Sequence, residues 1–109
     1  MTYEFRGGFQ IPGRFRVQGP WVILAVSPSE LEFRPRSRWW ARRLGPWRLE
    51  RSAVRAIYPG RTHPIFLWVP IHFLAKENMP WTFLAEWPEG VLGALTELGY
   101  PVRPDDPIR

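Results

Sequence analysis

Apolar and polar residues alternate through much of the middle of the chain, a pattern typical of half-buried β-strands. The clearest apolar run is 21–26, which is largely β-branched and short enough to be a strand covered on both faces. Residues 27–30 are turn formers, and residues 31–36 then alternate between apolar and charged. This order predicts a hairpin whose second strand has one face in water.

Further strands are predicted at 47–50, at 54–58 and at 81–87, where the alternation is clearest. Segment 65–75 is also typical of a strand, and Pro70 within it favours an edge position or a bulge. The first twenty residues are interrupted every few positions by turn formers. They therefore predict only a short strand around residues 15–17.

One helix is predicted, from Pro88 to Leu98. Proline at the first helical position loses no needed N–H, and Glu89 places a negative charge in the first turn. Gly99 follows as a left-handed cap. An apolar stripe runs along one face: Val91, Leu92, Leu95 and Leu98. A helix this short is marginal alone in water, so we expect it to dock.

About seven short strands followed by one helix, without β–α–β alternation, predict a mainly β protein. We expect an antiparallel barrel or sandwich of about seven strands, capped by the C-terminal helix. A chain of 109 residues has room for one core. We therefore expect a single domain over residues 1–102 and a loose tail at 103–109.

Three segments carry a family resemblance: a strand, turn and strand at 22–33, a strand that begins with tryptophan at 47–57, and a last strand and helix at 81–98. Their order resembles the small bacterial pleckstrin-homology-like (PH-like and GRAM-like) domains over residues 21–102. The resemblance implies a binding or scaffolding module, rarely an enzyme. Some members bind anionic lipids and many bind proteins.

The lipid-binding members of this family carry basic residues around the loop that joins their first two strands. The candidates for that loop in this sequence are residues 18–20 and 27–30, and neither segment is basic. The resemblance therefore does not predict inositol phosphate recognition of the usual kind.

Charge is concentrated in one quarter of the chain. Residues 34–61 contain nine arginines and one acid, Glu50, a formal +8, whereas the residues before them are neutral and those after them sum to −3. Guanidinium groups suit phosphate and carboxylate ligands, but a GC-rich genome also favours arginine, of which the chain has fourteen against one lysine. Composition leaves these two explanations open.

Residues suited to catalysis are scarce. The chain has no cysteine, its two histidines are His63 and His72, and its only aspartates lie in the expected tail. Neither a serine triad nor a set of three or four metal ligands can be assembled from them. We expect a protein that is not an enzyme and that needs no cofactor or metal, with His72 in a structural role.

The strongest candidate for a binding site is one loop rich in arginine and tryptophan. Tryptophan favours the headgroup level of a membrane, and arginine favours anionic lipid. The alternatives are a protein interface, or a loop in which one tryptophan faces the core while the arginines are solvated or pair with acids of the C-terminal half. The candidate residues are Arg36, Arg38, Trp39, Trp40, Arg42 and Arg43.

These observations predict a non-catalytic binding or assembly module that contacts a protein partner or forms a homo-oligomer. Peripheral binding to an anionic membrane through residues 36–43 is the alternative. Nucleic acid is not an expected partner, because the arginines are confined to one segment instead of following a groove lined with stacking rings. The start of the sequence lacks the order of a signal peptide, so we expect a cytoplasmic location, with the membrane periphery as the alternative.

Overall fold

The computed structural model describes residues 2–11, 15–37, 46–60, 69–75 and 80–104, without the side chains of residues 15 and 17–20. The strands are β1 (Tyr3–Ile11), β2 (Phe15–Val26), β3 (Glu30–Pro35), β4 (Trp47–Glu50), β5 (Val54–Pro59), β6 (Val69–Ala75) and β7 (Pro80–Ala85). A short 3-10 helix, η1 (Arg51–Ala53), joins β4 to β5, and helix α2 (Pro88–Glu97) follows β7. The predicted class, mainly β with one C-terminal helix, is confirmed.

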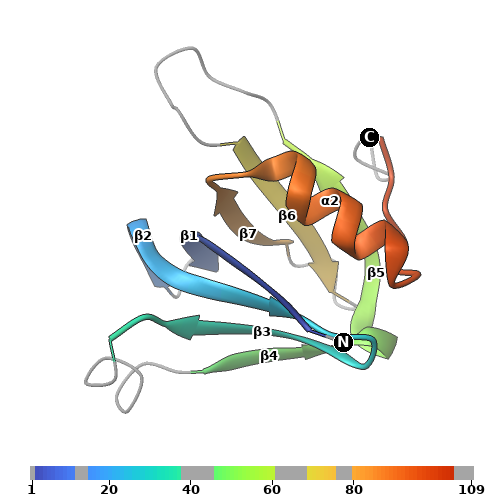
Figure 1. Ribbon diagram of the computed structural model, residues 1–109, viewed down its shortest axis with the longest axis horizontal. Coiled ribbons are helices and arrows are strands. Elements are labelled where there is room, and N and C mark those ends of the chain that lie inside the picture. Colours follow the sequence, from blue (N-terminus) through green and yellow to red (C-terminus); the bar gives the residue numbers. More distant parts are fainter. Residues whose placement is uncertain (1, 12–14, 38–45, 61–68, 76–79, 105–109) are drawn as a thin grey trace.

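All the strands belong to one antiparallel sheet, in the order β4-β3-β2-β1-β7-β6-β5. Strand β1 is central, and β4 and β5, which are consecutive in the sequence, form the two edges. Figure 1 shows β2, β3 and β4 side by side, with β5, β6 and β7 turned across them. The two halves face each other, because the ring of Phe33 in β3 meets that of Phe73 in β6 at 5.4 Å.

In the middle of β1, the pairing with β7 begins and the register of the pairing with β2 shifts. Gly7 pairs with Val22 of β2 and with Ala85 of β7, and the β1–β2 register shifts between Gly7 and Phe9. A Cβ atom at Gly7 would meet the carbonyl oxygen of Leu84, so only glycine fits this close approach. The expected turns in the first ten residues are therefore wrong, because Gly7 lies inside a nine-residue strand.

Residues 18–20 do not connect two strands either. They lie within β2, in a bulge where Gly8 alone stands opposite residues 18–21. The connection between β1 and β2 is instead at residues 12–14. The assignment of the first loop made from the sequence is therefore wrong, because a glycine and a proline here mark a bulge instead of a turn.

Strand β6 is internal, with β5 on one side and β7 on the other, so the edge position expected from Pro70 is wrong. Proline is tolerated because it is the second residue of the strand, before the ladder to β5 begins at Ile71. Its carbonyl still accepts a hydrogen bond from the N–H of Gly60 at 2.7 Å. The other part of the expected strand, residues 65–68, lies outside the described residues.

Helix α2 has nearly the predicted bounds. Val91 and Leu95 are fully buried, and Gly99 has φ of 84°, the left-handed conformation expected after a helix. The next residue, Tyr100, is buried and its hydroxyl donates to the carbonyl oxygen of Ser27 at 2.6 Å. Burial raises the pKa of this phenol, so the neutral form is the one that the fold favours.

After Tyr100 the chain runs along the edge of β5. The N–H of Ile57 donates to the carbonyl of Pro101 at 2.8 Å, and the N–H of Arg103 donates to the carbonyl of Ile57 at 2.6 Å. These two bonds form an isolated parallel bridge between Ile57 and Val102. The backbone is thus attached to the sheet through Arg103, one residue beyond the expected boundary at 102, and residues 105–109 lie outside the described part.

Candidate functional site

Of the six residues predicted to form a binding site, the structure describes one. Arg36 is exposed and directly follows β3. The other five lie outside the described residues: Arg38, Trp39, Trp40, Arg42 and Arg43.

The backbone fixes both ends of the segment that contains these residues. On one side, the N–H of Arg36 donates to the carbonyl oxygen of Trp21 in β2 at 2.8 Å. On the other side, Trp47 begins β4 and pairs with Phe33 of β3. Arg36 is therefore held beside Trp21, whose side chain is 60% exposed.

Trp21 is a candidate that the sequence reasoning missed. Segment 21–26 was expected to be covered on both faces, but only its core face, with Val22, Leu24 and Val26, is fully buried. The other face carries Ala25, which is buried, Ile23, which is half-buried, and Trp21, which is exposed. The sequence contained a signal for this, because strict alternation in a strand places residues 21 and 22 on opposite faces.

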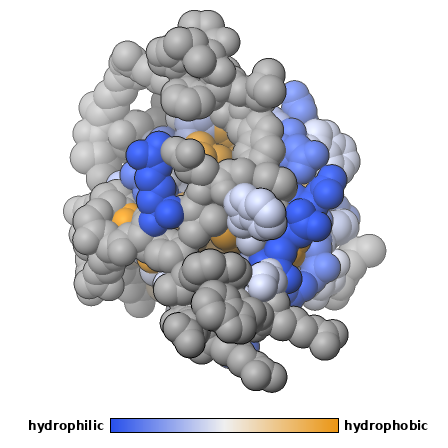
Figure 2. All heavy atoms as spheres, turned by 90° about the vertical axis from the view of Figure 1, so that its left-hand side faces the viewer, coloured by the Kyte–Doolittle hydropathy of each residue, from blue (hydrophilic) through white to orange (hydrophobic). Residues whose placement is uncertain are grey.

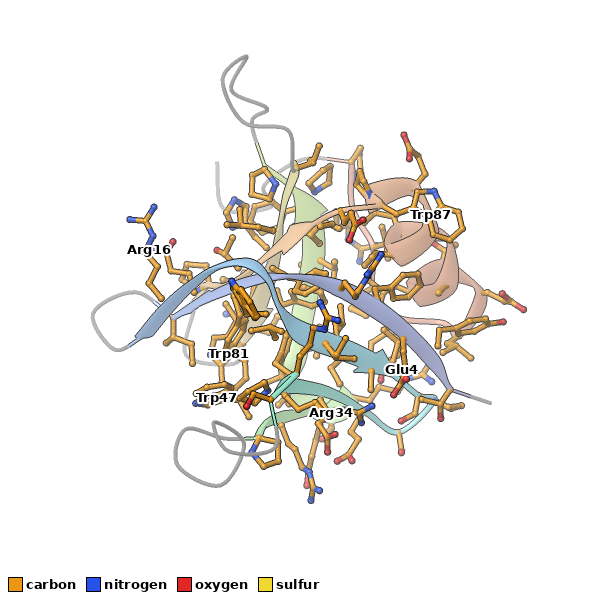
Figure 3. The ribbon with its side chains drawn as sticks, turned by 60° about the vertical axis from the view of Figure 1, so that its left-hand side comes forward. Glu4, Arg16, Arg34, Trp47, Trp81 and Trp87 are labelled. Atoms are coloured by element: carbon orange, nitrogen blue, oxygen red, sulfur yellow. The ribbon has the colours of Figure 1, made fainter. Side chains whose placement is uncertain are left out.

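Antiparallel topology gathers two connections at the same end of the sheet. The β1–β2 connection (12–14) and the β3–β4 connection both leave from the end opposite to the β2–β3 turn. Arg16, near the start of β2, is exposed and points away from the body of the molecule (Figure 3). We call this end, with Arg16, Trp21 and Arg36 as its described polar and aromatic residues, the basic end.

Two half-buried tryptophans close the core towards the basic end. Trp47 and Trp81 pack against Phe9, with ring centroids 5.4 and 5.9 Å away. Phe9 itself is stacked on Phe33 at 4.4 Å. Figure 3 shows Trp47 and Trp81 on the same side of the molecule, and Figure 2 shows small apolar patches and separate groups of hydrophilic side chains among the coloured atoms of this face.

Arg34 and Arg48, which also belong to residues 34–61, form ion pairs within the chain. Arg34 bonds to Glu4 and Glu32, and Arg48 bonds to Glu32 at 3.0 Å. Burial alone would lower the pKa of Arg34, but its bonds to Glu32 and Glu4 outweigh burial and raise it. These partners, Glu4 and Glu32, belong to the N-terminal half of the chain.

Arg51 has a structural role, because its side chain joins two parts of the fold. Its guanidinium donates to the carbonyls of Pro28, Leu98 and Gly99 at 3.1, 3.0 and 2.9 Å, and lies 5.3 Å from the ring centre of Tyr100. It joins the β2–β3 turn to the end of α2, where a cation suits the helix dipole. The arginine excess therefore has a structural part, which includes Arg34, Arg48 and Arg51.

The end of the sheet opposite to the basic end carries a shallow hollow of about 740 Å³. It is lined by Ser29, Glu30, Glu50, Arg51, Ser52 and Val54. Glu30 and Glu50 stand directly opposite each other across the β3–β4 ladder. Two like charges in that position repel, and Arg51 supplies a positive charge to the same lining.

His72 has the structural role expected for it. Its Nδ1 lies 2.8 Å from Oγ1 of Thr82, its partner across the β6–β7 ladder, and its ring packs beside Tyr58 with centroids 5.2 Å apart. Among the residues that the structure describes, no three histidine, aspartate or glutamate side chains are grouped closely enough to hold a metal ion. The described helices also include none that is long and apolar enough to cross a membrane.

The fold has a counterpart among solved structures. A crystal structure of the C-terminal domain of an unknown protein from Leishmania infantum superposes with a TM-score of 0.65. The match covers 88% of this chain and 81% of that domain, at 12% sequence identity, so it is a likeness of fold. No protein-family model matches the chain, and no curated protein sequence does so either.

Proposed function

We propose that this protein is a non-catalytic binding domain of the PH-like type that docks its basic end onto an anionic membrane surface. The observation that carries the proposal is the joint presence of exposed Arg16, Arg36 and Trp21 at one end of the sheet. The antiparallel sheet with one C-terminal helix is compatible with a domain of this type. The cytoplasmic location expected from the sequence is part of the proposal.

The location of the β1–β2 connection supports this proposal. With residues 18–20 as the first loop, that loop is neutral, whereas the connection at 12–14 brings Arg14 by sequence and is followed by Arg16. The β3–β4 connection at the same end contributes Arg38, Arg42 and Arg43 by sequence. Both connections at this end are therefore basic.

The charges supply a useful fraction of the binding free energy. At about 1 kcal/mol per arginine near an anionic bilayer, the six arginines of this end contribute about 6 kcal/mol. That corresponds to a dissociation constant in the tens of micromolar range. An exposed tryptophan adds affinity at the headgroup level, where an indole ring is preferred.

The test is co-sedimentation with vesicles of phosphatidylcholine alone and of phosphatidylcholine with phosphatidylserine. The wild type should bind only the anionic vesicles, and less as salt is added, because screening weakens the attraction. Arg16→Gln/Arg36→Gln should bind about thirtyfold more weakly, a loss of about 2 kcal/mol. The matched control Arg55→Gln/Arg103→Gln removes the same charge from exposed positions along β5 and should bind like the wild type.

Two results would overturn the membrane function. One is no binding of the wild type to anionic vesicles at low salt, and the other is equal loss in both double variants. Contact with a protein partner, which the sequence predicts first, stays an expectation for the same end. The result that would indicate a protein partner is an acidic protein that, in the absence of vesicles, binds the wild type but not Arg16→Gln/Arg36→Gln.

A further inference from the structure

Strand β4 forms one edge of the sheet. Its ladder partner is β3, and within the described residues its other side pairs with no strand. Figure 1 shows β4 at the lower margin of the molecule. An edge strand exposes unpaired N–H and C=O groups, which can pair with another chain.

The side chains of β4 alternate strictly. Leu49 is buried and Trp47 is half-buried towards the core, whereas Arg48 and Glu50 are exposed on the outer face. Arg48 bonds to Glu32 of β3, but none of the ion pairs between described residues engages Glu50. Glu50 instead faces Glu30, and the hollow beside it is open. A cation next to Glu50 would relieve this repulsion.

We propose that β4 is a self-recognition edge, at which two copies of this chain pair antiparallel about a two-fold axis perpendicular to the sheet. Because of this axis, one residue of β4 faces its own copy. With Leu49 at the centre, Arg48 of each copy stands opposite Glu50 of the other. The pairing then forms two opposite-charge pairs on the outer face and joins the two sheets into one.

The charges also select this register. With Arg48 at the centre, two arginines face each other, and with Glu50 at the centre, two glutamates do so. Like charges directly opposite are unfavourable, so both neighbouring registers are disfavoured. Natural edge strands are usually protected from pairing by charged side chains. In β4 the positive Arg48 and the negative Glu50 disfavour other strands but are complementary to β4 of a second copy.

The length of the strand limits the strength of the pairing. Pro46, which has no N–H, precedes β4, and the 3-10 helix η1 ends it after Glu50. The shared ladder is about as long as the shortest natural strands, so the dimer is weak and depends on protein concentration. The inference does not rest on the membrane function, because its charge pairs use Arg48 and Glu50 instead of Arg16, Trp21 and Arg36.

Sedimentation velocity over a wide range of protein concentration tests the inference. The mass of the wild type should rise from monomer towards dimer, and Glu50→Arg and Arg48→Glu should each stay monomeric, because each places like charges face to face. An equimolar mixture of the two variants should regain the dimer, since each Arg then faces a Glu across the edge. Glu89→Arg, an equal charge change on the exposed face of α2, should dimerise like the wild type.

A dimer in the mixture would show that both variants are folded and that each is monomeric alone because of its charges. Circular dichroism checks separately that each variant is folded. A wild type that stays monomeric at every concentration overturns the inference. So does a dimer that survives in Glu50→Arg, because the contact then uses another surface. Failure of the folded variants to associate with each other overturns the proposed register.

Discussion

At the scale of single residues, Arg51 fixes three parts of the chain with one side chain. It bonds to the β2–β3 turn and to the last two carbonyls of the α2 end, which would otherwise lack partners. Lysine has a single charge centre and cannot reproduce this fork of donors. A contact of this kind contributes more to the free energy of unfolding than an ordinary ion pair on the surface does.

We expect Arg51→Ala to lower the free energy of unfolding by about 2 kcal/mol, because hydrogen bonds from a charged donor are lost at several carbonyls. Arg51→Lys should retain only part of the stability that Arg51→Ala loses. Arg48→Ala, which removes an exposed ion pair with Glu32, should cost less than about 1 kcal/mol. Urea unfolding of the three variants measures these differences, and an equal cost for Arg48 and Arg51 would contradict the assignment.

Some roles of single residues could not be predicted from the sequence pattern. The role of Arg51 depends on a helix that begins 37 positions later, at Pro88, so no local pattern indicates it. Gly7 was taken for a turn residue because its requirement arises from Leu84, a neighbour distant in sequence. Arg36 was identified correctly as exposed, because a charged residue after an alternating strand follows from local pattern alone.

At the scale of elements, α2 contains two glycines in different surroundings. An added Cβ atom at Gly93 would have nothing within 4 Å, whereas at Gly90 it would meet the indole ring of Trp87. Alanine is preferred over glycine inside a helix by about 1 kcal/mol. The substitution should therefore help at one position and not at the other.

Gly93→Ala should raise the free energy of unfolding by about 0.5–1 kcal/mol. Gly90→Ala should give no such gain, because the ring of Trp87 must leave its place on the helix and its contact with Phe5. Thermal unfolding followed by circular dichroism compares the two variants. An equal increase for both would show that Trp87 does not pack over Gly90.

Elements with local signals were predicted well. Proline and glycine mark the two ends of α2, and alternation locates β3, β4 and β7, because these signals depend on neighbours in sequence. Strand β1 was missed and β6 was placed at an edge, since pairing in a sheet is set by distant segments. For the same reason the sequence could not show that the 12–14 and 38–45 connections leave from one end.

At the scale of the whole molecule, the described charges are distributed unevenly. The basic end carries Arg16 and also Arg36, which is held beside the exposed Trp21, whereas the opposite end carries the facing pair Glu30 and Glu50 together with Arg51. A molecule charged in this way orients in the field of an anionic surface before it makes contact. The orientation predicts that one exposed tryptophan meets the bilayer and the other does not.

Trp21 and Trp87 provide a matched pair for this comparison. They are 60% and 62% exposed, and they are the large apolar side chains that stand exposed within the described residues. Trp21 belongs to the basic end, whereas Trp87 lies beside α2, on the other side of the molecule from Arg16 in Figure 3. Either substitution by alanine removes the same ring, and each is checked for folding by circular dichroism.

The most informative single measurement is the affinity of Trp21→Ala and Trp87→Ala for vesicles that contain phosphatidylserine. Docking through the basic end predicts roughly tenfold weaker binding for Trp21→Ala, because an interfacial indole is lost, and unchanged binding for Trp87→Ala. Equal affinities for the two variants, or a larger loss for Trp87→Ala, would contradict a membrane contact at this end of the sheet.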